Sequence, residues 1–213
     1  MRSWLTMLGT IIGITAVVSL ISIGQGFQKA VDAQFETMGV DKIIISSSGT
    51  LFGLGETVNP LTEKDLKVVQ NVRGVKTATA VVFKLAQVKF NDDVAYVWVM
   101  GMPQDETKSV ISGVQNMKIV QGRDLEQGDT YKAVVGIRHV QGKVFDKNVN
   151  VRDKLTIEGV DYKVIGSLAS VGNPQDDSNI IIPLDQFRRL FGIPDKIDNI
   201  IVQVQEGEDI KEV

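Results

Sequence analysis

An apolar run near the N-terminus restricts what this chain can fold into. No charged residue occurs between Arg2 and Lys29, and the stretch from Trp4 to Ile23 is twenty residues long. A helix of about 20 residues, at about 1.5 Å per residue, spans the hydrocarbon core of a bilayer. We therefore predict a transmembrane helix over residues 1–25.

A cleavable secretory signal peptide is the main alternative interpretation of this run. The apolar region of a signal peptide is about 7 to 15 residues long and ends at a small-residue cleavage site. The run here is longer and continues directly into a helical pattern, which favours an uncleaved anchor. Because Arg2 precedes the run, the positive-inside rule predicts a cytoplasmic N-terminus and an extracytoplasmic main domain.

Small residues recur along the predicted membrane helix. Gly9 and Gly13 form a small-xxx-small pair, and Thr6 and Ala16 extend it on nearly the same face. Helices in lipid gain little from the hydrophobic effect, so small residues that let backbones approach closely favour their association. We predict that this face packs against another membrane helix. The alternative is that the glycines reflect only the greater frequency of glycine in membrane helices.

A second helical segment follows the span over residues 26–40. Its apolar residues have the i, i+3 or i+4 spacing of one helix face: Phe27, Ala30, Val31, Phe35 and Met38. Gly39 is a residue type that commonly ends a helix. If this stalk continues the span without a break, it forms a rod that can transmit movement. A stalk that merely docks on the external domain is the alternative.

Residues 41–102 show a β-α-β-β pattern. Thr62 and Asp65 have the spacing of a capping box, and Asn91-Asp92-Asp93 separates two β-rich runs as a hairpin turn would. The predicted segments are a strand at 41–47, a Gly-rich loop at 49–59, a helix at 62–72 and strands at 75–90 and 94–102. We expect a compact α/β unit.

The rest of the chain alternates short strands with short helices. Gly159-Val160-Asp161 marks a second hairpin, and Pro183 is expected at the first position of a helix. The predicted strands are 133–136, 154–158, 162–169, 179–182 and 199–204, and the predicted helices are 137–145, one that starts at Pro183 and one that starts at 208. The fold class expected is therefore α+β: one membrane helix with a stalk, then a mixed α/β extracytoplasmic domain.

Composition excludes several classes of function. The net charge is −3 without a clustered basic face, which argues against nucleic acid as a partner. The absence of cysteine excludes disulfides and thiolate chemistry. In an exported domain, this absence fits a bacterial or archaeal origin.

We predict no catalytic or metal site in this chain. His139 is the only histidine, and its position on a short helix predicts an exposed surface residue. Asp92-Asp93 and Asp176-Asp177 are paired carboxylates that we assign to turns rather than to calcium binding. The stretch 136–143 has five residues between its glycines and Val144 after its lysine, so it is not a phosphate-binding P-loop.

A family resemblance adds to this interpretation. The residues from Arg2 to Ile14, followed by Gly24-Gln25-Gly26, resemble the first transmembrane helix of MacB-type ABC transporter permeases, which belong to the FtsX-like permeases. The later motifs that match this pattern are Val134-Val135-Gly136, Lys154-Leu155-Thr156-Ile157, Val164-Ile165-Gly166 and Ile181-Ile182-Pro183-Leu184. The resemblance covers the whole chain and is most specific in the first twenty-six residues.

The resemblance implies a permease subunit of the cell membrane with four membrane helices and a large domain between the first two. Its implied partners are an ABC ATPase that binds ATP and Mg²⁺, a second permease copy in a homodimer or heterodimer, and the lipid bilayer. This chain would be a fragment that lacks helices two to four, with no cofactor of its own. ATP-driven movement would pass through the first helix and a lever at residues 27–38 to the outer domain, a mode called mechanotransmission.

By resemblance, the external domain divides into a porter-like part and an inserted sabre-like part. The expected division is a membrane helix at 1–25, a stalk at 26–40, a porter-like part at 41–102, a sabre-like part at 103–195 and a return to the porter-like part at 196–213. A membrane-anchored module with a single span, which binds or senses a ligand outside the cell, is the alternative function. The pattern does not indicate which substrate is moved.

Overall fold

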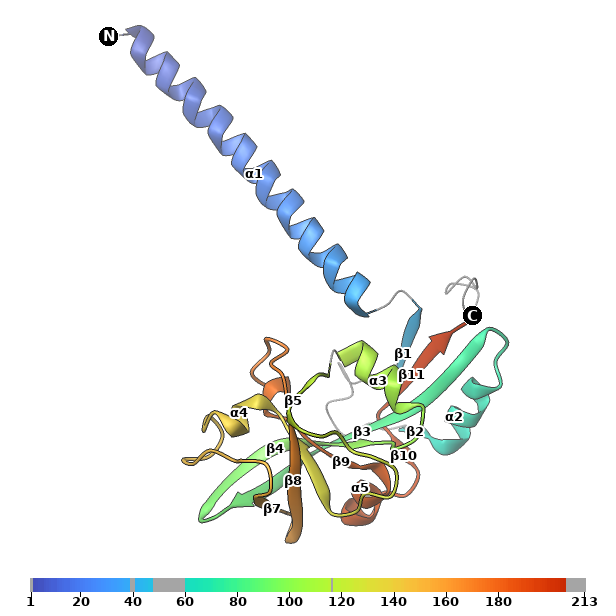
Figure 1. Ribbon diagram of the computed structural model, residues 1–213. Coiled ribbons are helices and arrows are strands. Elements are labelled where there is room, and N and C mark those ends of the chain that lie inside the picture. Colours follow the sequence, from blue (N-terminus) through green and yellow to red (C-terminus); the bar gives the residue numbers. More distant parts are fainter. Residues whose placement is uncertain (1, 39–40, 48–59, 116, 206–213) are drawn as a thin grey trace. The chain divides into compact units, whose positions relative to one another are not determined.

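The computed structural model describes residues 2–38, 41–47, 60–115 and 117–205. It consists of two compact units, residues 1–40 and residues 41–213, which we describe separately. The first unit is helix α1 (Arg2–Met38), whose 37 residues run without interruption (Figure 1). At about 1.5 Å per residue this helix is about 55 Å long. It therefore contains both the predicted span and the described part of the predicted stalk.

Within the described residues, α1 is long and apolar enough to cross a membrane between Met7 and Lys29. None of this stretch is buried against the rest of the chain. Large apolar side chains along α1 are exposed; Trp4 is 75% exposed and Leu20 is 76% exposed. Such an exposed apolar cylinder is unfavourable in water and favourable in lipid.

The second unit is a mixed α/β domain built on one large sheet. The strands of this sheet are β1 (Lys42–Ser46), β3 (Val75–Phe90), β4 (Asp93–Met102), β5 (Ile119–Gly122), β6 (Lys132–Val135), β7 (Lys154–Ile157), β8 (Val160–Leu168), β9 (Ile180–Pro183) and β11 (Asn199–Val204). A small ladder joins β2 (Leu61–Thr62) to β10 (Lys196–Ile197). The helices are α2 (Glu63–Gln70), α3 (Lys108–Gln115), α4 (Ile137–Val140) and α5 (Leu184–Phe191), and a 3₁₀ helix lies at Asp176–Ser178.

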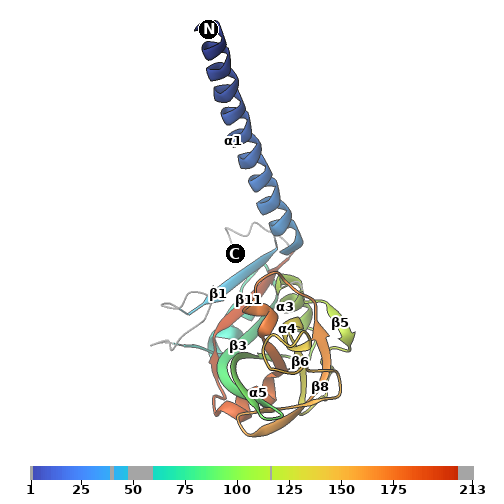
Figure 2. The same ribbon diagram turned by 90° about the vertical axis from the view of Figure 1, so that its left-hand side faces the viewer.

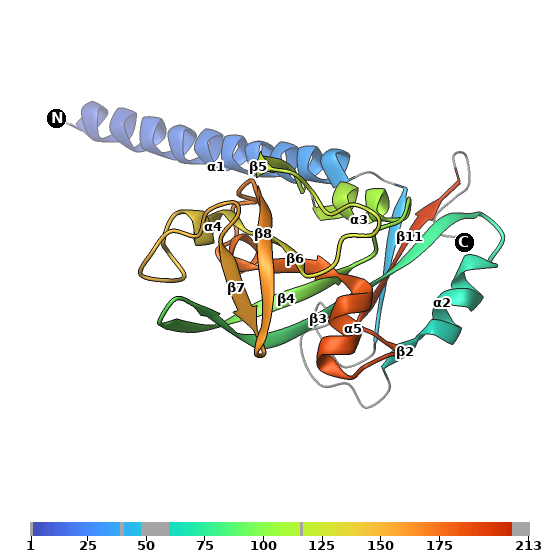
Figure 3. The ribbon, with the colours of Figure 1, turned by 60° about the horizontal axis from the view of Figure 1, so that its bottom comes forward.

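The strand order is β1-β11-β3-β4-β9-β6-β8-β5, and β7 pairs with both β3 and β8. This double pairing closes a ring of strands in the order β3, β4, β9, β6, β8 and β7. Most neighbours are antiparallel, but β4 with β9 and β6 with β8 are parallel. Figure 3 shows β3 and β4 passing beneath β6, β7 and β8.

Strand β3 serves both halves of the domain because it is sixteen residues long. Its first half, up to Val81, pairs with β11, and its second half, from Val82, pairs with β4. Figure 2 shows β1 and β11 side by side at the edge of the sheet. The long strand therefore joins the open sheet of β1, β11 and β3 to the closed ring.

Three apolar clusters form the core. The interior of the ring is filled by side chains such as Val88, Val99, Leu155 and Ile182, and Phe187 of α5 joins them with no exposed surface. The second cluster lies under α3, and the third lies under α2. Helices α2, α3 and α5 therefore each bury an apolar face against the sheet, as amphipathic helices do.

Several predicted elements are confirmed with small differences in their bounds. The first hairpin pairs Phe90 with Asp93 around Asn91-Asp92, and Asn91 has a φ of 54°. The second turns at Glu158-Gly159, one residue earlier than predicted. The carboxylate of Asp65 accepts hydrogen bonds from the backbone N–H and the hydroxyl of Thr62, at 2.8 and 2.7 Å.

Other predictions are wrong or lie outside the described residues. The helix predicted at 137–145 ends at Val140, because Gly142 adopts a φ of 64° and turns the chain away. Pro183 ends β9 and precedes α5 as its N-cap rather than starting the helix. Helix α3 was not predicted. The Gly-rich loop at 49–59 and the helix predicted from 208 fall on residues that the structure does not describe.

The porter-like and sabre-like division stays a prediction. Residues 41–213 form one compact unit, and β9 from the predicted sabre-like part lies between β4 and β6 in the sheet. The backbone ladder is therefore shared across the predicted boundaries.

Candidate functional site

The predicted packing face of α1 is open. A Cβ atom added at Gly9 or Gly13 would have nothing within 4 Å, and Ala16 is exposed. The side chain of Thr6 lies outside the described residues. No described residue fills the notch that the two glycines leave, so the face is available to a helix from elsewhere. That such a helix packs there stays a prediction.

The stalk residues lie on the last turns of the same helix. Phe27 is 71% exposed. The side chains of Val31, Phe35 and Met38 lie outside the described residues, although the backbone is helical up to Met38. The contacts of the stalk therefore stay a prediction, whereas its continuity with the span is observed.

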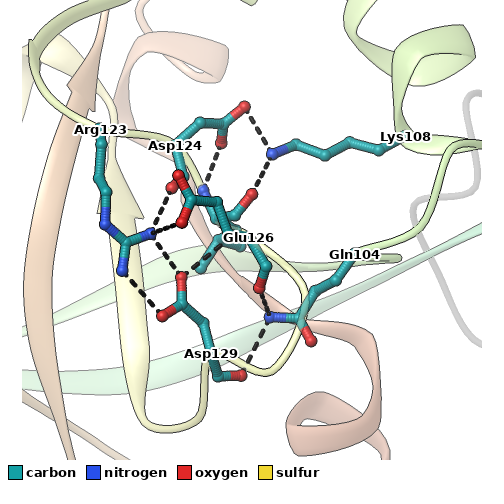
Figure 4. Close-up of polar contacts among 7 residues, drawn as sticks. Gln104, Lys108, Arg123, Asp124, Glu126 and Asp129 are labelled. Carbon is teal, nitrogen blue, oxygen red and sulfur yellow. Dashed lines mark hydrogen bonds and ion pairs between the residues drawn. The ribbon is translucent and has the colours of Figure 1, made fainter.

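A polar network in the second unit organises the loop after β5. The guanidinium of Arg123 donates two parallel hydrogen bonds to the carboxylate of Asp129, at 2.6 and 2.8 Å, and a third to the Asp124 carbonyl at 2.8 Å (Figure 4). Asp129 also accepts the backbone N–H of Glu126 at 3.0 Å. This paired geometry is the strong form of an arginine–carboxylate contact.

Two residues from other elements tie this loop to the sheet. The ammonium of Lys108, on α3, donates to the Leu125 carbonyl at 2.5 Å and pairs with the Asp124 carboxylate at 2.6 Å. The amide nitrogen of Gln104, just after β4, donates to the carbonyls of Glu126 and Asp129 at 2.7 and 3.0 Å. The loop is therefore held from β4 and from α3 together.

The electrostatics of the network agree with its geometry. The hydrogen bonds from Arg123 lower the pKa of the Asp129 carboxyl below its usual value, more strongly than burial raises it. The same contact raises the pKa of the Arg123 guanidinium. Asp129 therefore stays ionised at neutral pH and acts as a fixed acceptor.

A cleft of about 430 Å³ lies between this loop and α5. Its walls come from the end of β4, from the loop at 127–130 and from the first turns of α5: Pro103, Gln104, Asp105, Gln127, Gly128, Asp129, Thr130, Pro183, Leu184, Asp185, Gln186 and Arg189. Cavities of about 300 to 1,000 Å³ are typical of ligand sites. The sequence did not point to this cleft, because its walls come from three segments far apart in the chain.

The prediction that His139 is exposed is wrong. The side chain has no exposed surface, and Nε2 donates to the Ser178 carbonyl at 2.8 Å. Burial lowers the pKa of His139 to about 4, so the ring is neutral at pH 7. The ring packs against Phe145, with the centroids 5.6 Å apart. The chain turns back after α4 and covers the histidine, which the helical pattern at 137–145 did not predict.

The paired carboxylates have structural roles. Asp177 is buried and accepts the Ser170 hydroxyl at 2.5 Å and the Val171 backbone N–H at 2.7 Å. Asp92 lies in the turn between β3 and β4. Within the described part of the chain, no group of three or more His, Cys, Asp or Glu residues could hold a metal ion.

Comparison with known proteins identifies the family. The family model for the MacB-like periplasmic core domain matches residues 3–213. The chain belongs to this family. An uncharacterised ABC transporter permease of Methanocaldococcus jannaschii, MJ1507, is 34% identical over 212 residues, which are all of this chain and 52% of the relative. The macrolide export ATP-binding/permease protein MacB of Bdellovibrio bacteriovorus is 26% identical, over all of this chain and 34% of the relative.

Solved structures share the fold at low sequence identity. The extracellular domain of the noncanonic ABC-type transporter YknZ from Gram-positive bacteria has a TM-score of 0.60 and 20% identity, covering 80% of this chain and 87% of that one. The periplasmic region of MacB from Actinobacillus actinomycetemcomitans has a TM-score of 0.66 and 12% identity, covering 84% and 81%. The MacB-like core domain thus keeps its fold with few identical residues.

The chain spans about half the length of MJ1507 and about a third of the MacB relative. Both matches cover the apolar helix of this chain and the domain that follows it. These relatives are permeases, or permeases fused to an ATP-binding part, by name.

Proposed function

We propose that this chain is the first transmembrane helix and the extracytoplasmic domain of a permease subunit in a MacB-type ABC transporter. The family membership and the permease relatives support this role. The N-terminus lies in the cytoplasm and residues 41–213 lie outside the membrane, in keeping with Arg2 before the span. The chain itself performs no catalysis; a partner ATPase binds ATP and Mg²⁺.

The observation that carries the proposal is the unbroken course of α1. The apolar part, Met7–Lys29, continues as helix to Met38, and only three residues separate its end from β1 at Lys42. A helix without a proline or a break moves as one rod over its length. Movement at the cytoplasmic end of α1 is thereby passed to the start of the outer domain. This mode of coupling is mechanotransmission, and the ATPase cycle that drives it serves export.

A membrane-anchored binding module is the second candidate. The cleft beside α5 favours it, because a binding domain needs such a site and a mechanical element does not. The two roles differ in their partners: the permease requires an ABC ATPase and a second permease copy, and the module requires neither.

Purification of the full-length protein from detergent-solubilised membranes separates the two roles. We expect an ABC ATPase to copurify in a stable ratio and the complex to hydrolyse ATP. A substitution in the ATPase that blocks ATP hydrolysis is the control for contaminating activity. Recovery of the protein alone, in the presence of an expressed ATPase from the same source, would contradict the permease role and favour the anchored module.

A further inference from the structure

Three lysines lie side by side on the outer surface of the ring of strands. Lys163 of β8 is directly opposite Lys154 of β7 and in register with Lys132 of β6. Residues in register on neighbouring strands project from the same face of the sheet, and neighbouring strands lie about 5 Å apart. Lys154 and Lys163 are exposed and Lys132 is half-buried, whereas the residue that follows each of them is buried in the ring. The three side chains therefore form one line across β7, β8 and β6, which we call the lysine row.

The lysine row has no counterion in the described part of the chain. None of its three members forms an ion pair with a described residue. Lys132 contributes to the low pKa of Asp129, but both oxygens of that carboxylate accept hydrogen bonds from Arg123. Like charges directly opposite each other on neighbouring strands are destabilising. The fold keeps the three lysines together against this repulsion, and such conflicts with stability are expected at functional sites.

Two residues with a left-handed backbone flank the lysine row. Tyr131, just before β6, has a φ of 51°, and Arg152, shortly before β7, has a φ of 88°. The N–H of Lys163 donates to the Tyr131 carbonyl at 2.9 Å, and the N–H of Arg152 donates to the Val164 carbonyl at 2.8 Å. Backbone strain of this kind persists only where the surrounding structure holds it, and it gathers at functional sites. Strand β8 therefore holds the chain on both sides of the row.

The lysine row is a line of cations rather than a broad patch. Its neighbours along β8 on the same face are Asp161, which accepts the Thr156 hydroxyl at 2.8 Å, and Ile165, which is only 9% exposed. A planar anionic surface, such as a membrane, would meet the carboxylate of Asp161 beside the row. Lysine is depleted in protein–protein interfaces, which depend on aromatic and arginine anchors. A chain-like anion laid across the three strands fits the row better than either kind of surface.

We propose that the lysine row binds a linear phosphodiester polymer. Each ammonium group carries three donors and acts as a point charge toward a tetrahedral phosphate. A planar carboxylate is matched best by the fork of an arginine, and all three positions of the row are lysine. A polymer without bases, such as poly(glycerol phosphate), follows from the extracytoplasmic location, and on this point the inference rests on the proposed function. The sequence did not indicate this site, because the three lysines lie far apart in the chain.

The test uses no ATPase, so its failure is distinguishable from failure of the permease proposal. The full chain is placed in nanodiscs of neutral lipid, and fluorescence polarisation measures the binding of labelled poly(glycerol phosphate). We expect binding that weakens as the salt concentration rises. The slope of log K against log salt concentration should be about −2 if the three lysines neutralise one phosphate each.

Lys163→Gln removes the central charge and keeps the length of the side chain. We expect this variant to bind the polymer about fivefold more weakly, and Lys163→Glu to lose binding. Lys76→Gln is the matched control and should bind normally, because Lys76 is exposed on β3 and lies outside the row. Urea unfolding separates binding from folding. Lys163→Glu should unfold at a higher urea concentration than the natural chain, since its carboxylate lies between two lysines instead of a third positive charge.

Absence of polymer binding by the natural chain, or equal binding by the natural chain and Lys163→Glu, would overturn the proposal. Equally tight binding of polyglutamate would overturn the choice of phosphate. Tighter binding to vesicles of phosphatidylglycerol than to the polymer would assign the row to a membrane surface instead. A lower stability of Lys163→Glu would contradict the repulsion on which the argument depends. The salt dependence and the comparison of ligands use the natural chain, so they do not depend on the folding of a variant.

Discussion

At the scale of single residues, His139 is the ionisable group most affected by the fold. It has no exposed surface, one hydrogen bond to the Ser178 carbonyl, and an Nδ1 atom without a partner among the described residues. Burial lowers its pKa to about 4, from about 6.5 in an unfolded chain. Protonation therefore favours the unfolded chain at mildly acidic pH.

The sign of the resulting pH dependence follows from proton counting. Between pH 6.5 and pH 4 the unfolded chain binds a proton on His139 and the native chain does not, so the stability of the domain falls as pH falls. We expect a loss of about 2 kcal/mol in the free energy of unfolding between pH 7 and pH 5 from this residue alone. Urea unfolding of the full chain at both pH values measures this loss.

His139→Gln provides the comparison, because it keeps an N–H donor for Ser178 and does not titrate. The variant should be less stable at pH 7 through poorer packing against Phe145, but its stability should change by less between pH 7 and pH 5. An identical pH dependence in the two proteins would mean that His139 is protonated in the native state.

The burial of His139 also shows why the environment of a single side chain can be unpredictable from sequence. The local sequence pattern does not predict that residues 144–149 fold back over the histidine. Phe145 and Val149 lie in a loop, and their side chains belong to the core of the ring. The place of Gln186 in the wall of the cleft was equally unpredictable from sequence, because the other walls come from the end of β4 and from the loop at 127–130.

At the scale of elements, the approach of α5 to β4 depends on Gly101. A Cβ atom there would lie 2.6 Å from Cγ2 of Val82 and 2.9 Å from Cβ of Phe187. We expect Gly101→Ala to destabilise the domain by about 1 to 3 kcal/mol, because the closed ring and α5 cannot both move away. Urea unfolding measures the loss.

Gly113→Ala is the matched control. Gly113 lies within α3, and an added Cβ would meet only the flexible end of the Lys42 side chain, at 3.3 Å. Alanine in a helix interior is favoured over glycine by about 0.5 to 1 kcal/mol, so this change should leave stability unchanged or raise it. Equal destabilisation by the two substitutions would show that close packing at Gly101 is not the cause.

The elements that were predicted from sequence are those with local causes. Turn residues and alternating runs predicted the β3–β4 and β7–β8 hairpins, and Thr62 with Asp65 predicted the start of α2. Pairing across the chain was not predictable: β9 lies parallel to β4 although almost eighty residues separate the two in sequence. Helix α3 was missed because its short apolar stripe, Val110, Ile111 and Val114, is no longer than that of a strand.

The open face of α1 gives a prediction for membrane assembly. Replacing Gly9 and Gly13 together by leucine fills the notch and should weaken association between full-length permease copies in membranes about tenfold. The pair Ile11→Leu and Val18→Leu lies on the opposite side of the helix and serves as the control. Energy transfer between labelled copies in lipid vesicles measures the association. Unchanged association of the glycine variant would contradict the packing prediction.

At the scale of the whole molecule, the chain combines one long apolar helix with a MacB-like periplasmic core domain. In the MacB-like core domain, one long strand joins an open sheet to a closed ring. Helix α1 supplies an uninterrupted rod. We propose that the rod moves the core domain when the partner ATPase binds ATP.

The central claim is tested by interrupting the rod in the full-length permease with its ATPase in lipid vesicles. Seven Gly-rich residues inserted between Gln28 and Lys29 break the helix, whereas seven Ala-rich residues at the same place lengthen it by two turns and keep its face. This chain contains no cysteine. Once any cysteine in the rest of the full-length permease is replaced, a spin label on Asp92→Cys reports the distance between the outer domains of two permease copies.

We predict that ATP binding changes this distance in the natural protein and in the Ala-rich variant, and that the Gly-rich variant hydrolyses ATP without the change. The same ATP-dependent change in the Gly-rich variant would contradict transmission through α1.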